Sequence, residues 1–231
     1  MEEREKLVLF DIGSTLLHLN FQVFSVAASE LSKYKTSDEF MEAYRKSGID
    51  IQIMMGKMST GEYFKELRKV VNPKREVLDS ELRIVFGKSF GAPIKEMIEL
   101  KKRLHNFGYT VGLFSDIAEL SYGILKERYP EIFEYSDIDL FSYKLGEMKS
   151  GKAGFEKVKR YDVVLIDDKI KYLENSRLYG WKFIWFRPYI DKYEPLRIFQ
   201  GEAKVTDYEY LRIADSGEEV EDALRSFGID I

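Results

Sequence analysis

The chain has no cysteine and only two histidines, His18 and His105, among its 231 residues. The absence of cysteine excludes disulfide bonds, thiolate metal sites and a thiol nucleophile. Two histidines are too few for a metal site built from imidazole rings. The sequence also lacks any apolar run of the ~20 residues that a membrane-spanning helix needs.

Neither sign of charge dominates the composition, since 36 Lys and Arg stand against 40 Asp and Glu, for a net charge of -4. A surface that binds nucleic acid or anionic lipid needs an excess of basic residues. The composition therefore argues against nucleic-acid and membrane partners, and we expect a small-molecule substrate. The charged residues 1–6 lead into a short apolar run, which is unlike a signal peptide, so we expect a cytoplasmic protein.

Short apolar runs rich in Val, Ile, Leu and Phe recur along the chain. They cover residues 6–10, 109–114, 162–166 and 181–186. Runs that are apolar on both faces are typical of buried parallel strands. Helical patterns separate them, including one over residues 93–108 with Pro93 in its first turn and Gly108 at its end. Strands that alternate with helices predict an α/β fold with a doubly wound parallel sheet.

Further elements complete the expected core. We predict helices over residues 117–128, 152–160, 170–178, 208–213 and 218–226, and a short strand near residues 203–206.

The segment from about residue 20 to residue 90 interrupts the alternation. Helical spacing occurs in residues 25–35, 37–48, 60–71 and 75–90, with no strand pattern between them. The simplest interpretation is a small all-helical domain inserted after the first strand. We therefore predict a core domain of residues 1–18 and 91–231, and a helical cap of residues 19–90 over the carboxyl edge of the sheet.

Polar residues follow the predicted strands at the edge where open α/β sheets bind ligands. These candidates are Asp11, Ser115, Asp116, Asp167 and Asp168, together with Lys149 in a loop that precedes a helix. They supply a carboxylate nucleophile, groups for an anion and acidic ligands for a hard cation such as Mg²⁺. This inventory fits phosphoryl transfer through an aspartyl-phosphate.

Each candidate also has a purely structural interpretation. Asp11 could belong to a turn, Ser115 and Asp116 could cap a helix that begins at residue 117, and Lys149 could be a solvated surface residue. The adjacent carboxylates of Asp167 and Asp168 could form a solvated turn. Two neighbouring carboxylates repel each other unless a cation or hydrogen-bond donors intervene, which favours a metal.

Four segments in order carry a resemblance to a known family. They are DIGSTL at 11–16, GYTVGLFSD at 108–116, LGEMKSGKAGF at 145–155 and VVLIDDKIKYLENSRLYGWKFIWF at 163–186. Together they resemble the four motifs of the haloacid dehalogenase-like (HAD) hydrolase superfamily. That resemblance implies a Rossmann-like core with a cap inserted between the first and second motifs.

The resemblance also implies roles for individual residues. Asp11 would be the nucleophile, and Ser115 and Lys149 would hold the phosphoryl oxygens. Asp11, the carbonyl of Gly13, Asp167 and Asp168 would make the Mg²⁺ site. The implied phosphate-binding residues are Gly13, Thr15, Ser115, Asp116 and Lys149.

Three positions depart from the family pattern. Gly13 stands where the phosphatases usually have the aspartate that protonates the leaving group, Ser150 replaces a proline, and Tyr172 replaces an Asn or Asp. Loss of general acid catalysis costs about 10²–10⁴-fold in rate. Phosphate esters with acidic leaving groups, such as aryl or acyl phosphates, should suffer least.

Three functions remain open at this stage. The first is a Mg²⁺-dependent phosphatase that acts on a small phosphorylated metabolite. The second is a metal-independent 2-haloacid dehalogenase, which needs no leaving-group acid but leaves the Asp167 and Asp168 pair without a purpose. The third is a catalytically weak protein that binds a phosphorylated ligand.

Overall fold

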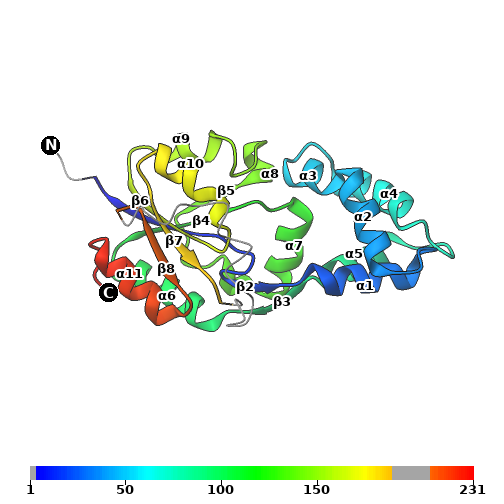
Figure 1. The fold of residues 1–231 in the computed structure, drawn as a ribbon, viewed down its shortest axis with the longest axis horizontal. Coiled ribbons are helices and arrows are strands. Elements are labelled where there is room, and N and C mark those ends of the chain that lie inside the picture. Colours follow the sequence, from blue (N-terminus) through cyan, green and yellow to red (C-terminus); the bar gives the residue numbers. More distant parts are fainter. Residues whose placement is uncertain (1–3, 189–208) are drawn as a thin grey trace.

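The computed structural model describes residues 4–188 and 209–231, which form a parallel sheet flanked by helices, with further helices at one end (Figure 1). The strand order is β5-β4-β1-β6-β7-β8, and each neighbouring pair is parallel. The strands are β1 (Lys6–Phe10), β4 (Thr110–Ser115), β5 (Ile138–Phe141), β6 (Asp162–Asp167), β7 (Lys182–Phe186) and β8 (Leu211–Ala214). The predicted doubly wound α/β fold is confirmed, with all four apolar runs as strands.

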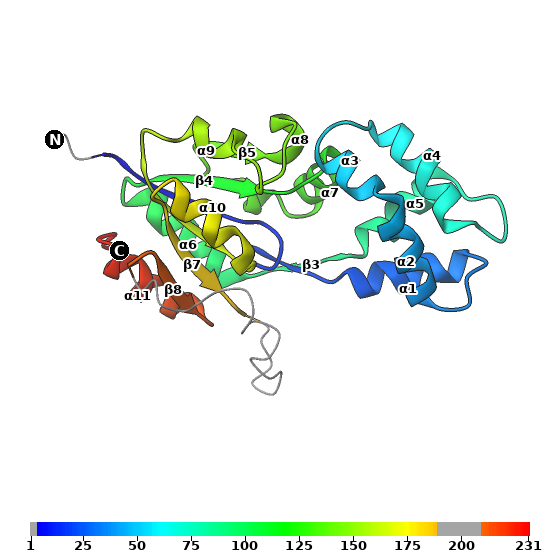
Figure 2. The same cartoon turned by 45° about the horizontal axis from the view of Figure 1, so that its top comes forward.

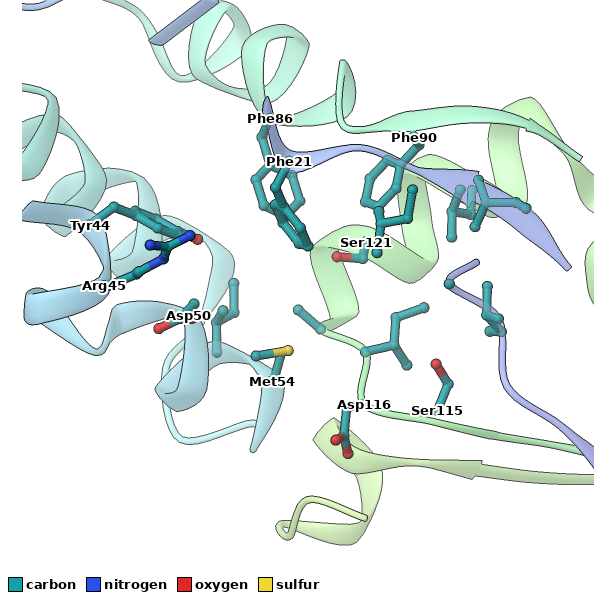
Figure 3. A pocket seen from close by; sticks show the side chains of 18 of the residues that line it. Phe21, Tyr44, Arg45, Asp50, Met54, Phe86, Phe90, Ser115, Asp116 and Ser121 are labelled. Atoms are coloured by element: carbon teal, nitrogen blue, oxygen red, sulfur yellow. The ribbon is translucent and has the colours of Figure 1, made fainter. Parts of the chain in front are cut away.

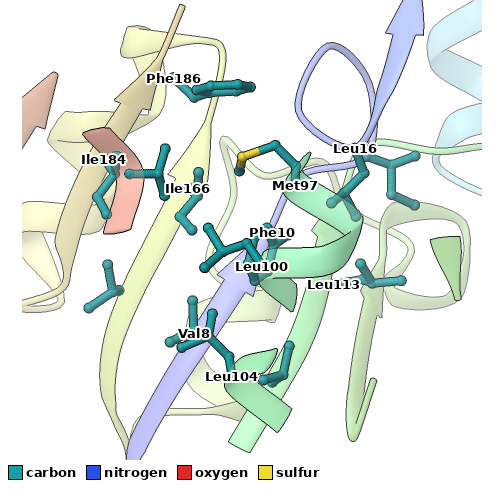
Figure 4. Packing of buried hydrophobic residues seen from close by; sticks show 14 of the residues in the cluster. Val8, Phe10, Leu16, Met97, Leu100, Leu104, Leu113, Ile166, Ile184 and Phe186 are labelled. Carbon is teal, nitrogen blue, oxygen red and sulfur yellow. The ribbon is translucent and has the colours of Figure 1, made fainter. Parts of the chain in front are cut away.

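Strand β1 lies inside the sheet and is buried on both faces. Val8 and Phe10 pack into the apolar cluster on one face, and Leu7 and Leu9 pack into the cluster on the other. Figure 4 shows Val8 and Phe10 facing helix α6 (Lys95–Asn106). Full burial of one such side chain contributes about 1.5–3 kcal/mol to stability, so a polar residue at any of these four positions would be costly.

The helices of the core lie within or close to the predicted ranges, except that the short helix over Ser142–Leu145 was not predicted. They are α6 (Lys95–Asn106), α7 (Glu119–Arg128), α8 (Ser142–Leu145), α9 (Ala153–Lys157), α10 (Leu173–Leu178) and α11 (Gly217–Ser226), with 3₁₀ turns at Pro130–Ile132 and Ile170–Tyr172. Gly108 has φ 89°, the left-handed conformation expected after α6. Within the described residues, no helix is both long and apolar enough to cross a membrane.

Four points of the core differ from the prediction or cannot be compared with it. Pro93 is not in the first turn of a helix, because it ends a strand and α6 begins at Lys95. The helix predicted over residues 208–213 was wrong, since Leu211–Ala214 is the strand β8, and β5 was not predicted at all. The strand predicted near residues 203–206 lies outside the described residues.

Five helices gather at the other end of the molecule (Figures 1 and 2). They are α1 (Phe21–Leu31), α2 (Ser37–Ser47), α3 (Ile49–Met54), α4 (Thr60–Val71) and α5 (Asp79–Gly87), which we call the helical group. The ring of Phe24 packs edge-on against Phe40, Tyr44 and Phe86, with centroids 5.3–5.7 Å apart. The buried hydroxyls of Tyr44 and Tyr63 are 2.8 Å apart, within hydrogen-bond distance. The helical group therefore has an aromatic core of its own.

A two-stranded antiparallel ribbon joins the helical group to the sheet (Figure 2). It consists of β2 (Leu17–Leu19) and β3 (Phe90–Pro93), which pair through Leu17 with Pro93 and Leu19 with Phe90. The boundaries proposed between core and cap fall within this ribbon. The division into two domains remains a prediction.

Candidate active site

The candidate site lies where β1, β4 and β6 end side by side. In the register of the sheet, Phe10 pairs with Leu113 of β4 and with Ile166 of β6. The next residue of β1, Asp11, donates its backbone N–H to the carbonyl of Ile166 at 2.9 Å. This register places Asp11 beside Asp167, as parallel strands require of residues one step further along.

Lys149 joins two of the carboxylates. Its Nζ lies 2.8 Å from Oδ1 of Asp11 and also pairs with Asp167. The three side chains are 2%, 5% and 0% exposed, in the order Lys149, Asp11 and Asp167. The two carboxylates offset the cost of burying this ammonium.

Asp168 brings a third carboxylate to this place. One oxygen from each of Asp11, Asp167 and Asp168 lies within 4.8 Å of the others. Oδ1 of Asp168 is buried and has no hydrogen-bond partner among the described residues. Carboxylate oxygens are the ligands that Mg²⁺ prefers, so the three residues fit the expected cation.

The three carboxylates hold their protons differently. Burial, together with the charge of Asp11, raises the pKa of Asp167 to about 7 and that of Asp168 to about 6, against the lowering effect of the neighbouring lysine ammonium groups. Burial also raises the pKa of Asp11, but the charges of Lys149 and Lys169 outweigh it and hold that pKa below its usual value. Asp11 is therefore the carboxylate that stays ionised most readily.

Ser115 and Asp116 lie at the end of β4. Ser115 is buried, and its hydroxyl contributes a hydrogen bond that lowers the pKa of Asp11. Asp116 accepts the backbone N–H of Lys149 at 2.7 Å and the hydroxyl of Tyr172 at 2.7 Å. The side chain of Asp116 therefore positions the Lys149 loop, which leaves only its backbone for the predicted contact with phosphate.

The proposed helix-capping role of Ser115 and Asp116 was wrong. Helix α7 begins at Glu119 and its N-cap is Ala118, whose side chain offers no hydrogen bond. The backbone N–H of Ile117 instead donates to Oγ of Ser142 at 2.9 Å. Ser115 and Asp116 therefore do not cap α7.

No protein-family model and no curated protein sequence matches the chain. Among solved structures, it is similar to a HAD-family enzyme from Bacteroides thetaiotaomicron in complex with magnesium and inorganic phosphate, with a TM-score of 0.67 and 18% identity. That match covers 78% of this chain and 92% of the other. The L-2-haloacid dehalogenase from Xanthobacter autotrophicus, with chloropropionic acid covalently bound, gives a TM-score of 0.62 at 11% identity, over 96% and 98% of the two chains.

The chain has the HAD fold. A third structure agrees, described as a predicted HAD-like family hydrolase from Porphyromonas gingivalis, with a TM-score of 0.66, 16% identity and coverage of 78% and 90%. The roles of individual residues do not follow from a fold likeness at such identities, so they remain predictions.

The turn after β1 of this HAD fold explains why residue 13 is glycine. A Cβ atom at Gly13 would lie 2.9 Å from Cδ2 of Leu19, too close for an ordinary contact. Ser14 next to it has φ 59°. Thr15 is fully buried and its Oγ1 has no hydrogen-bond partner among the described residues. Phosphate binding by Gly13 and Thr15 remains a prediction, and no side chain at position 13 can protonate a leaving group.

Two residues near the site were missed from the sequence. Tyr172, noted only as a departure from the family pattern, holds Asp116 in place. Lys169 is close enough to Asp11 and Asp168 that their charges raise the pKa of its ammonium, against the lowering effect of burial. The sequence signal for Lys169 was its position directly after Asp167 and Asp168.

A cavity of about 230 Å³ lies between the helical group and the strand ends (Figure 3). Its lining comes from both parts of the HAD fold and consists of Ile12, Gly13, Leu17, Leu19, Phe21, Met41, Tyr44, Arg45, Asp50, Ile53, Met54, Phe86, Phe90, Ser115, Asp116, Ile117, Ala118, Ser121 and Leu125. Gly13, Ser115 and Asp116 of the candidate site line this cavity. The cavity therefore adjoins the cluster of Lys149 and the three carboxylates of Asp11, Asp167 and Asp168, which are not in its lining.

Proposed function

We propose that this protein is a hydrolase of the HAD superfamily, and that it is a Mg²⁺-dependent phosphatase acting on a small phosphorylated metabolite. The observation that carries the proposal is the Lys149 ammonium, 2.8 Å from Asp11 and paired with Asp167, beside the unpartnered oxygen of Asp168. A nucleophile, an anion-binding cation and acidic metal ligands are thus within reach of one phosphoryl group. The neighbour from Bacteroides thetaiotaomicron, in complex with magnesium and phosphate, supports this assignment.

The mechanism begins at Asp11. Because its pKa lies below the usual value, Asp11 is ionised at neutral pH and attacks phosphorus as the ester bond breaks. Lys149 and Ser115 stabilise the phosphoryl oxygens in the transition state. A Mg²⁺ ion held by Asp11, Asp168 and Asp167 would neutralise charge on the transferring group. Water then attacks the phosphorus of the aspartyl-phosphate, which releases phosphate and restores Asp11.

The leaving group must take its proton from solvent. Gly13 offers no acid, and the acidic side chains of the site serve as nucleophile or metal ligands. An alkoxide is a poor leaving group without protonation, whereas a phenolate or carboxylate leaves unaided. The proposed phosphatase therefore favours esters with acidic leaving groups.

A second candidate is a metal-independent 2-haloacid dehalogenase. The dehalogenase from Xanthobacter autotrophicus covers more of this chain than the first neighbour, 96% against 78%. Displacement of halide by Asp11 needs no acid at position 13. We rank it second because it gives no use to the unpartnered carboxylate of Asp168, which is costly to bury without a cation.

Assays of the purified protein separate these functions. We expect phosphate release from p-nitrophenyl phosphate and acetyl phosphate that needs Mg²⁺ and disappears in Asp11→Asn. Chloride release from 2-chloropropionate without Mg²⁺ would favour the dehalogenase. Binding of inorganic phosphate with no turnover of any ester would favour a phospholigand-binding protein. Either of these two results would overturn the proposal.

A further inference from the structure

The cavity beside the candidate site has mainly apolar walls. Figure 3 shows the rings of Phe21, Phe86 and Phe90 on one side of it, with Met54 across from them. Phe21 is 45% exposed, although it is a large aromatic side chain. An exposed ring at the wall of an apolar cavity is typical of a surface that a ligand covers.

Two charged side chains of this wall lie on the helical group. Arg45 and Asp50 line the cavity there, and Oδ1 of Asp50 is buried with no hydrogen-bond partner among the described residues (Figure 3). The hydroxyl of Tyr44 already bonds Tyr63, and both carboxylate oxygens of Asp116 already accept hydrogen bonds. The wall is therefore apolar beside Phe21 and Phe90, and the charged side chains of Arg45 and Asp50 come from the helical group.

The volume of the cavity limits the size of the ligand. Its volume is about 230 Å³, whereas an apolar cavity of ~150 Å³ is enough to bind benzene. One aromatic ring with a short substituent therefore fits in the cavity. The thioethers of Met41 and Met54 add favourable contacts with a ring edge.

The chemistry of the site points to the same group independently. Gly13 leaves the site without a leaving-group acid, and a phenolate is among the leaving groups that need none. Gly13 and Ser115 both line the cavity, so a leaving group attached to a phosphoryl group at Ser115 would extend into it.

Resting on the phosphatase function proposed above, we propose that the substrate is an aryl phosphate whose compact ring occupies this cavity beside Phe21 and Phe90. In the first step an oxygen of Asp11 bonds to phosphorus and the bond between phosphorus and the phenolic oxygen breaks. The phenolate leaves with the electron pair and takes a proton from water. Phe21, Phe90 and Ser121 line the place of the ring.

Variants of the wall locate the ring. Phe21→Ala removes an exposed wall residue, and Ser121→Leu fills part of the cavity. Because one methylene in an apolar pocket changes discrimination about 10–200-fold, we expect each variant to lower the kcat/KM ratio of phenyl phosphate to acetyl phosphate about tenfold. Phe107→Ala is the matched control, since Phe107 is also exposed, at 65%, and does not line the cavity. A ratio unchanged in both wall variants would overturn the proposal.

A binding measurement separates this inference from the phosphatase function. We titrate phenol into the Asp11→Asn protein and follow NMR chemical shifts, expecting saturable binding that Phe21→Ala weakens. Asp11-dependent hydrolysis without phenol binding would overturn the cavity assignment and leave the phosphatase intact. Phenol binding without hydrolysis of any ester would overturn the phosphatase, and the ring would then not be a leaving group.

Discussion

Two buried lysines at different places on the core have opposite surroundings. Lys149 at the carboxyl edge of the sheet is 2% exposed, and Lys101 on α6 is 1% exposed. Lys149 pairs with the carboxylates of Asp11 and Asp167, whereas Lys101 donates to the backbone carbonyl of Ile132 at 2.9 Å and to that of Glu134. Burial lowers the pKa of both ammonium groups. The carboxylates reverse this for Lys149, whose pKa is raised, while that of Lys101 falls to about 8.

The different surroundings of Lys101 and Lys149 indicate different roles for the two regions. Neutral carbonyls accept the hydrogen bonds of Lys101, so this lysine has no carboxylate of the described residues in contact with it and serves as a structural link. At the sheet edge, the three carboxylates of Asp11, Asp167 and Asp168 lie near the ammonium groups of Lys149 and Lys169, so negative charge is in excess. Buried unbalanced charge is costly and occurs where chemistry or ion binding uses it. This contrast supports the proposal that the carboxyl edge is the functional region, and the predictions below test it.

The largest effect is expected from Asp11→Asn. It removes the nucleophile and one partner of Lys149 while keeping the shape of the side chain. Loss of a covalent nucleophile costs about 10⁴-fold or more in kcat, which phosphate-release kinetics would measure. The exposed Asp222→Asn serves as the control and should keep full activity.

Lys149→Met should lower kcat about 10²–10³-fold, because an oxyanion-stabilising donor is lost. In metal-free protein it also leaves Asp11 and Asp167 buried without their nearest counter-charge, which costs about 3–5 kcal/mol. Lys101→Met removes hydrogen bonds to carbonyls and, within the part of the chain that the structure describes, no carboxylate ion pair, so it should cost no more than about 1–3 kcal/mol. Urea unfolding of both variants compares the regions directly. Equal losses of unfolding free energy in the two variants would contradict the contrast between Lys149 and Lys101.

Mg²⁺ should stabilise the folded protein through the excess carboxylates. At a hundredfold excess over its Kd, a ligand adds about 2.7 kcal/mol to the free energy of unfolding. Asp168→Asn should abolish most of this gain, since it removes the oxygen that lacks a partner. Thermal unfolding with and without Mg²⁺ measures the shift. A gain that persists in Asp168→Asn would place the metal elsewhere.

Gly13→Asp adds a carboxyl group to the Lys149 region. We expect about tenfold faster turnover of alkyl phosphates, because the new side chain can protonate the leaving group. The double variant with Leu19→Ala should respond more than Gly13→Asp alone, since Leu19 occupies the space that the side chain needs. If alkyl esters gain nothing in either variant, another group already supplies the proton.

The smallest effect concerns Lys101. Its folded-state pKa of about 8 lies below the ordinary value of 10.5, so the unfolded chain binds the proton more tightly. Stability therefore rises with pH between these values, by about 1 kcal/mol from pH 8 to pH 9. Lys101→Met should remove this rise in urea unfolding. A rise of the same size in the variant would refute the assignment.

The sequence predicted the inner strands and the convergence of their ends. β1, β4, β6 and β7 are apolar on both faces, and parallel strands necessarily bring their carboxyl ends to one edge. β5 and β8 lie at the two edges of the sheet, where one side is less covered, and they include Asp139 and Arg212. A search for apolar runs misses both strands, because each contains a charged residue.

The finer parts of the site depend on contacts between residues far apart in the chain. Asp116 and Tyr172 are 56 positions apart and meet through one hydrogen bond. Local periodicity carries no information about such a pair. The cavity likewise requires side chains from the helical group, the ribbon and α7 at once, and their relative placement appears only in three dimensions.

The most direct test of the central claim is to trap the covalent intermediate. Protein turning over phenyl phosphate with Mg²⁺ is quenched in acid and digested, and the peptides are analysed by mass spectrometry. The account predicts a phosphoryl group on Asp11, absent from Asp11→Asn and from protein without Mg²⁺. Full phosphate release with no phosphorylated Asp11, and undiminished in Asp11→Asn, would contradict it.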